Sequence, residues 1–94
     1  MDLCEQTLCQ RAEPRVQFFV AAMLHCAGRS VAVKIRNFSS SGTRIEGELI
    51  PPEGAFVVLR RGMLAAEGAV VWREGDAAGI DFDTPVDVFD WMPG

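Results

Sequence analysis

The chain is short, acidic and moderately apolar, with 94 residues, a formal net charge of −4 and 49% hydrophobic residues. A chain of this length forms one domain with one small core, burying roughly 60 to 65% of its unfolded surface. The acidic balance argues against DNA or RNA as a partner, because proteins that bind nucleic acids usually present a basic surface to the phosphates. No apolar run approaches the roughly 20 residues of a membrane helix, so we expect no membrane insertion.

The cysteines and the first residues bear on the compartment. Residues 1–5 lack the basic start of a signal peptide, and the three cysteines, an odd number, form no recognised disulfide framework. We therefore expect a cytoplasmic protein. Eight of the nine cationic residues are arginine, whose planar fork pairs with phosphate and with guanine edges, so the composition permits a nucleotide site.

Residues 1–10 form a short lead, and the domain proper is expected to span residues 11–94. Two arginines, Arg11 and Arg15, follow the lead. Pro14 disfavours a helix at the residue before it, so we expect these arginines on an extended loop. At ~3.3 Å per residue they lie about 13 Å apart along the chain, far enough to contact different parts of one ligand.

From Val16 onward, apolar and polar residues alternate in short segments separated by turn residues, which is typical of β-strands. The expected strands are residues 16–25, 30–37, 43–48, 55–60, 63–73 and 77–82. Parallel strands would need crossovers of a dozen or more residues, and the connections are too short for them. The pattern predicts an all-β fold, an antiparallel barrel or sandwich of six strands.

A short helix is expected after Phe82. Asp83 or Thr84 would cap it and Pro85 would occupy its first position. Its apolar stripe would consist of Val86, Phe89 and Met92. This stripe is predicted to cover an end or side of the barrel.

The run from Asn37 to Gly42, with sequence NFSSSG, separates the second and third expected strands. Asn and Ser side chains can bond to nearby backbone groups, and Gly42 permits a positive φ, so turn formation alone would explain every residue. Turn formation leaves the upstream arginine pair unexplained. The two together have the form RxxxR followed by NxSxxG.

This combination resembles the PilZ domain family, bacterial receptors for the second messenger cyclic di-GMP. The resemblance runs from Arg11 to the terminal helix, and it includes an apolar-Trp run ending at Trp72 and a Gly-x-x-Phe strand at residues 79–82. It implies a PilZ-like six-stranded barrel of the split-barrel type with a short C-terminal helix. Each motif alone is common, whereas both in this order are fairly specific.

The resemblance also implies a ligand and a site. Arg11 and Arg15 would contact guanine and phosphate, and Asn37, Ser39 and Gly42 would form the barrel side of the site. Cyclic di-GMP would be the ligand, with no other cofactor. Gln10 stands where family members often carry a further arginine, which leaves open whether one or two ligand molecules bind.

Other candidate residues have simpler interpretations. His25 beside Cys26 does not have the spacing of a zinc site, so we expect strand packing and no metal. Trp72 and Phe82 fall within alternating strands and are expected in the core. The acidic residues near the C-terminus are interpreted as a solvated face and a helix start; they are Asp81, Asp83, Asp87 and Asp90.

Three classes of function follow from these features. The first is a non-catalytic receptor for cyclic di-GMP whose N-terminal arginine loop changes conformation on binding and signals to a partner protein. The second is a PilZ-like adaptor that binds a protein without a ligand. An enzyme ranks last, because the sequence contains no nucleophile–base pair and its one histidine lies within an expected strand.

Overall fold

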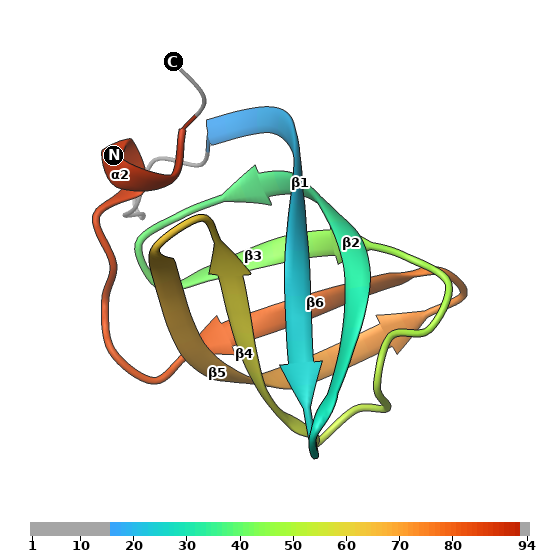
Figure 1. The fold of residues 1–94 in the computed structure, drawn as a ribbon. Helices are drawn as coiled ribbons and strands as arrows, with labels where there is room; N and C mark the ends of the chain where they lie inside the picture. Colours follow the sequence, from blue (N-terminus) through green and yellow to red (C-terminus); the bar gives the residue numbers. More distant parts are fainter. Residues whose placement is uncertain (1–15, 93–94) are drawn as a thin grey trace, which may run out of the picture.

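The structure is a computed structural model that describes residues 16–92, with side chains from Phe19 onward. Six antiparallel strands form a closed barrel in the order β1-β2-β3-β6-β5-β4 (Figure 1). The predicted all-β barrel is therefore confirmed. The elements are β1 (Val16–Cys26), β2 (Arg29–Phe38), β3 (Gly42–Glu46), β4 (Phe56–Arg61), β5 (Leu64–Glu74), β6 (Ala77–Phe82) and one helix, α2 (Val88–Trp91).

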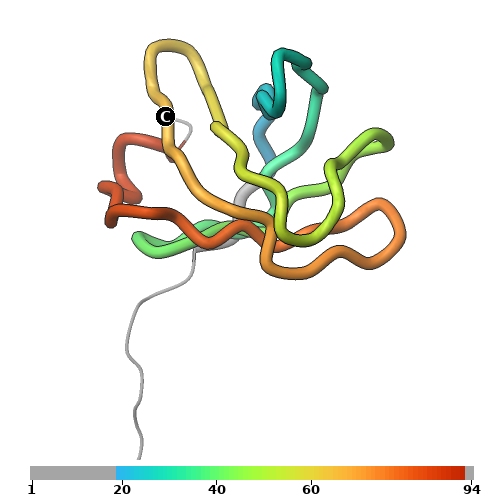
Figure 2. Tube along the Cα trace, turned by 90° about the horizontal axis from the view of Figure 1, so that it is seen from below, coloured from blue at the N-terminus to red at the C-terminus, as the bar shows by residue number. Residues whose placement is uncertain are grey.

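Short connections make consecutive strands antiparallel neighbours in the barrel. Two residues join β1 to β2, β4 to β5 and β5 to β6, as the strand bounds show. Figure 2, turned by 90°, shows the chain curving around a common interior. The β3 strand ends at Glu46, two residues earlier than predicted, because the Gly47 N–H donates to the Asp76 carbonyl at 2.8 Å and the chain turns toward the β5–β6 connection.

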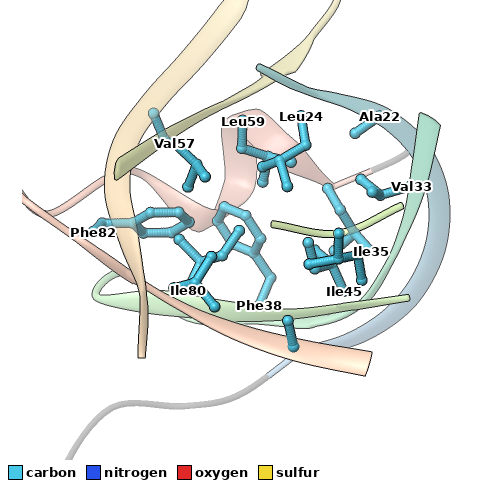
Figure 3. Packing of buried hydrophobic residues seen from close by; sticks show 14 of the residues in the cluster. Ala22, Leu24, Val33, Ile35, Phe38, Ile45, Val57, Leu59, Ile80 and Phe82 are labelled. Atoms are coloured by element: carbon cyan, nitrogen blue, oxygen red, sulfur yellow. The ribbon is translucent and has the colours of Figure 1, made fainter. Parts of the chain in front are cut away.

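One face of each strand points into the barrel and supplies the core (Figure 3). Alternation thus identified the inward residues of β1 and β2: Ala22 is buried opposite Val33, and Leu24 and Ile35 are buried as well. Phe38, at the end of β2, is fully buried; its ring centroid lies 5.3 Å from that of Phe82, which is in the core as predicted.

The C-terminal helix differs from the prediction. It starts at Val88 with Asp87 as its N-cap, whose carboxylate accepts the Phe89 N–H at 2.9 Å. Asp83, Thr84 and Pro85 precede the helix, so the predicted cap and first position are wrong. The reason is that Val86 donates its N–H to the Ser40 carbonyl at 2.9 Å, which ties this segment to the β2–β3 turn before the helix can begin.

The later start also changes which helical residue is buried. Phe89, in the predicted apolar stripe, is 81% exposed, while Trp91 is buried. Trp91 stacks on Phe38 with ring centroids 5.2 Å apart. Val86 and Met92 are partly buried against the core, so the stripe is correct at these two positions and wrong at Phe89. The helix lies at the end of the barrel where β2 finishes (Figure 1).

The prediction that Trp72 lies in the core is wrong. The β5–β6 register shifts between Val70 and Trp72, so Val71 is an extra residue and Trp72 pairs with Gly79. This bulge interrupts the alternation. As a result, Val70 points inward and is buried, while Trp72 is 39% exposed on the outer face.

His25 accepts or donates a hydrogen bond between its Nδ1 and the Ser30 hydroxyl at 2.7 Å, and residues 16–92 contain no group of three potential metal ligands. Within the same range, no helix has the length and apolar character needed to cross a bilayer.

Candidate functional site

The turn between β2 and β3 is closed by its own residues. Ser39 donates its backbone N–H to the Gly42 carbonyl at 2.8 Å, and its hydroxyl donates to the same oxygen at 3.2 Å. Ser39 is only 1% exposed. Its hydroxyl therefore holds the turn together from inside, as expected of a buried polar group.

The same turn is attached to the C-terminal segment. The Phe82 N–H donates to the Ser41 carbonyl at 2.7 Å, and the Val86 N–H donates to the Ser40 carbonyl at 2.9 Å. Phe38 precedes the turn and stacks on Trp91. The turn is thus fixed both by the barrel and by the segment that leads into α2.

Gly42 is required by a close approach between strands. A Cβ atom at this position would lie 2.5 Å from the Ile80 carbonyl oxygen, which belongs to the backbone of β6. Gly42 is not among the described glycines with positive φ, so the close approach of β6 and not a left-handed turn accounts for the glycine here. The missing side chain lets β3 and β6 pair at the edge of the candidate site.

Residues of β2, β3, β5 and β6, together with Ser41 of the turn, line a hollow of about 310 Å³. In register, Asn37 of β2 pairs with Arg44 of β3, which pairs with Gly79 of β6, which pairs with Trp72 of β5. The lining residues are Asn37, Ser41, Gly42, Thr43, Arg44, Val71, Trp72, Gly79, Ile80 and Asp81. We call this hollow the Trp72 hollow.

The Trp72 ring lies over Gly79. A Cβ atom on Gly79 would be 2.1 Å from the indole Nε1 and 2.6 Å from Cε2, so only glycine leaves room for the ring in this position. Arg44 approaches from the neighbouring strand, with its Cζ 6.0 Å from the centroid of the Trp72 ring. The ring is therefore supported by the sheet, carries a cation beside it, and is partly open to solvent.

The Asn37 side of the hollow is held by the adjacent strand. The Thr43 hydroxyl donates to the Asn37 carbonyl at 2.5 Å, and Thr43 is buried. Asn37 thus has a fixed backbone at the point where its amide lines the hollow. An amide, a guanidinium and a supported aromatic ring together can bind a planar heterocycle by stacking and by hydrogen bonds to its edge.

The charges of the Trp72 hollow nearly cancel. Arg44 and Asp81 line it with opposite signs. Glu46, just outside, lies 3.9 Å from the Arg44 guanidinium and 2.6 Å from that of Arg36. A ligand with two phosphates would therefore need further cations from elsewhere in the chain.

The predicted site residues have different outcomes. Asn37 and Gly42 line the hollow, whereas Ser39 does not and lies buried beneath the turn. Arg11 and Arg15 lie outside the described residues. Sequence reasoning did not identify Arg44, Trp72 or Asp81 as residues of the site. Alternation along β3 predicts that Arg44 faces outward and was a usable signal. The bulge in β5 reverses the direction that alternation predicts for Trp72.

No curated protein matches the chain. The family model of the PilZ domain matches residues 10–89, which begins just before Arg11 and extends through Trp72 into α2. Because the match covers most of the sequence and the barrel is the one that the resemblance implies, the chain belongs to the PilZ domain family.

Proposed function

We propose that this chain is a receptor for cyclic di-GMP, and that the ligand binds at the Trp72 hollow. The PilZ family is one of cyclic di-GMP receptors, which supports the class of ligand. The observation that carries the placement is the partly exposed Trp72 ring on Gly79, with Arg44 on one side and the NxSxxG turn at the edge.

One guanine base stacks on the open part of the Trp72 ring. Base–aromatic stacking contributes about 1 to 3 kcal/mol per base. Arg44 lies close enough to the same ring to reach the edge of a stacked base, where a guanidinium pairs with the O6 and N7 of guanine. The Asn37 amide contributes a further donor and acceptor at the rim.

Arg11 and Arg15 supply the cations that the hollow lacks. The backbone of Val16 pairs with that of Phe38, which directly precedes the NxSxxG turn. Arg15 is joined to Val16, so its Cα is about 3.8 Å from that residue, and Arg11 is at most about 18 Å away along the chain. The chain is therefore long enough for either guanidinium to reach a ligand at the hollow, and we propose that each binds a phosphate bidentately.

Ser39 and Gly42 act on the shape of the site. Ser39 holds the turn from inside, and Gly42 allows β3 and β6 to pair beside the ligand. Removing either group would alter the hollow without removing a charge from it. Their effect on affinity is therefore indirect, while that of Arg11, Arg15 and Trp72 is direct.

The output is a change in the N-terminal segment. A ligand held between Arg11 and Arg15 on one side and the barrel on the other would fix residues 11–15 against the Trp72 hollow and reposition the lead before them. A partner protein then recognises the altered surface, and no catalysis is involved. Because cyclic di-GMP is an intracellular messenger, we place this event in the cytoplasm.

The proposal is tested by calorimetric titration of the purified chain with cyclic di-GMP, GTP and cyclic GMP in parallel. We expect cyclic di-GMP to bind more tightly than either mononucleotide. Trp72→Ala should weaken binding by about 1 to 3 kcal/mol. The matched control is Phe89→Ala, which removes an exposed aromatic ring outside the hollow.

Two outcomes would reject the proposal. If no heat appeared at high micromolar cyclic di-GMP, the receptor function would be wrong, and the adaptor without ligand would be favoured. If binding occurred but Trp72→Ala behaved like Phe89→Ala, the ligand would bind elsewhere.

A further inference from the structure

A second hollow lies on the same outer face, over β1 and β2. It has a volume of about 450 Å³ and shares no lining residue with the Trp72 hollow. Its lining residues are Phe19, Val20, Ala21, Lys34, Arg36 and Glu46. We call it the Phe19 hollow. It combines one aromatic ring, two cations and one carboxylate, and the receptor function proposed above assigns it no role.

Phe19 is an exposed aromatic residue with one face already covered. The Arg36 Cζ lies 4.5 Å from the centroid of the Phe19 ring, within the range of a cation–π contact. Phe19 is nevertheless 69% exposed. The guanidinium therefore supports the ring from one side and leaves the rest of it accessible to a planar group.

Arg36 is held in an unusual position. It is the extra residue where the β2–β3 register shifts between Ile35 and Asn37. Its Nη1 donates to Glu46 Oε1 at 2.6 Å, while its buried Nε has no hydrogen-bond partner among the described residues. A buried donor without a partner is unfavourable, and such groups occur where a bound molecule supplies the acceptor.

The two hollows are connected through one carboxylate. Glu46 contacts Arg36 with Oε1 and lies 3.9 Å from Arg44 Nη2 with Oε2. Arg36 stacks on Phe19, and Arg44 lies beside the Trp72 ring. The outer face therefore contains the same arrangement twice, an arginine paired with an exposed aromatic ring, on either side of Glu46.

We propose that the Phe19 hollow is a second nucleotide subsite, in which a purine base stacks on the accessible face of Phe19 and Lys34 binds a phosphate. Lys34 stands opposite Ala21 in β1 and Glu46 in β3, and the small Ala21 side chain leaves space beside it. In the closed barrel, β2, β3 and β6 lie between β1 and β5 on one side, and β4 lies between them on the other.

This inference rests on the proposed function, because it extends the same binding face. The base can come from the second half of one cyclic di-GMP molecule or from a second molecule, and both have the same chemistry. The two sources differ in stoichiometry, so one titration distinguishes them.

The test compares wild-type protein with Phe19→Ala in calorimetric titrations with cyclic di-GMP. If one molecule spans both hollows, Phe19→Ala should bind with unchanged stoichiometry and about tenfold lower affinity, which is at the low end for one lost stack. If a second molecule binds, the wild type should take up two equivalents and Phe19→Ala one. Phe19→Trp should restore the wild-type result in either case.

The matched control is Phe56→Ala, because Phe56 is also an exposed phenylalanine, is 57% accessible, and lines neither hollow. Lys34→Ala should reduce the salt dependence of binding, since it removes a phosphate contact. If wild-type protein binds cyclic di-GMP and Phe19→Ala is indistinguishable from Phe56→Ala, the second subsite is wrong while the receptor function stands. If the wild type does not bind at all, the receptor function itself has failed.

An indirect effect of Phe19 through Glu46 is separated by a double substitution. Glu46→Gln weakens the link between Arg36 and Arg44. If Phe19 contacts the base, Phe19→Ala should cause the same loss of affinity in the Glu46→Gln background. If the loss disappears in that background, Phe19 only positions Arg44 and the subsite is rejected. If Phe19→Ala weakened binding to a partner protein but left the affinity for cyclic di-GMP unchanged, the nucleotide subsite would also be rejected, and the hollow would be a protein-binding surface.

Discussion

Gly79→Ala is the substitution that tests the binding site most directly. The added Cβ would lie 2.1 Å from Trp72 Nε1, and its three nearest atoms all belong to the Trp72 side chain. The indole must therefore move off β6. None of the three atoms nearest to the added Cβ belongs to the backbone, so the sheet itself need not shift. The substitution displaces the ring on which the base would stack, and it leaves unchanged every charged residue that is proposed to bind the ligand.

The expected magnitudes follow from this geometry. Displacing the ring should cost the stacking contribution of about 1 to 3 kcal/mol, which is a 5- to 150-fold weaker affinity. Stability should change little. Trp72 is already 39% exposed, so moving its ring exposes little further apolar surface. Alanine also lowers the conformational entropy of the unfolded chain relative to glycine, which offsets about 0.4 to 1 kcal/mol of any loss in the free energy of unfolding.

The assay is a calorimetric titration with cyclic di-GMP together with thermal unfolding, in a double-mutant cycle. Gly79→Ala should have almost no further effect in a Trp72→Ala background, because the ring that it displaces is gone. Gly42→Ala is the contrasting control: its Cβ would lie 2.5 Å from the Ile80 carbonyl oxygen, so it should destabilise the barrel. Wild-type affinity in Gly79→Ala, or additive effects in the cycle, would refute the role of Trp72.

Three further predictions concern the arginines, the turn and the charge of the ligand. Arg15→Ala should weaken binding by about 1.5 to 3 kcal/mol in the same titration. Arg29→Ala, which removes an exposed charge beside the β1–β2 turn, should have little effect on binding, and neither substitution should shift the melting temperature. If Arg15→Ala unfolded the protein, that arginine would be structural. Ser39→Ala should lower the unfolding free energy by about 0.5 to 1.5 kcal/mol in a denaturant titration, and an unchanged midpoint would contradict its role in the turn. Affinity should fall as salt is raised from 50 to 500 mM, and a constant value would mean that the arginines act by stacking alone.

The barrel could be predicted from the sequence because its strands follow regular alternation with short turns. The inward positions of β2, for example, include Val33 and Ile35, which alternation identifies and which are both buried. The helix was predicted less well. Its start is set by the hydrogen bond between Val86 and Ser40, two residues that are distant in sequence. A contact of that kind leaves no local pattern, so capping preferences alone favoured Asp83 or Thr84.

The candidate site was predicted in part, for a related reason. The turn chemistry of NxSxxG identified the location, and Asn37 and Gly42 indeed line the Trp72 hollow. The role of Ser39 was not visible, since a buried hydroxyl bonded to the Gly42 carbonyl and an exposed one contacting ligand have the same sequence. Trp72 was missed because its place in an alternating strand indicates the core.

Register shifts explain why prediction from alternation fails at the outer face. Three of them occur in the strands that carry the two hollows: between Gln17 and Val20, between Ile35 and Asn37, and between Val70 and Trp72. Without the shift between Val70 and Trp72, Trp72 would point inward. Arg36 is the extra residue of the β2–β3 shift. The β5 bulge therefore brings the Trp72 ring onto the outer surface, where ordinary alternation already places Arg44. Bulges commonly re-aim side chains next to functional sites, so the positions that break the strand pattern are the ones where a ligand site should be sought.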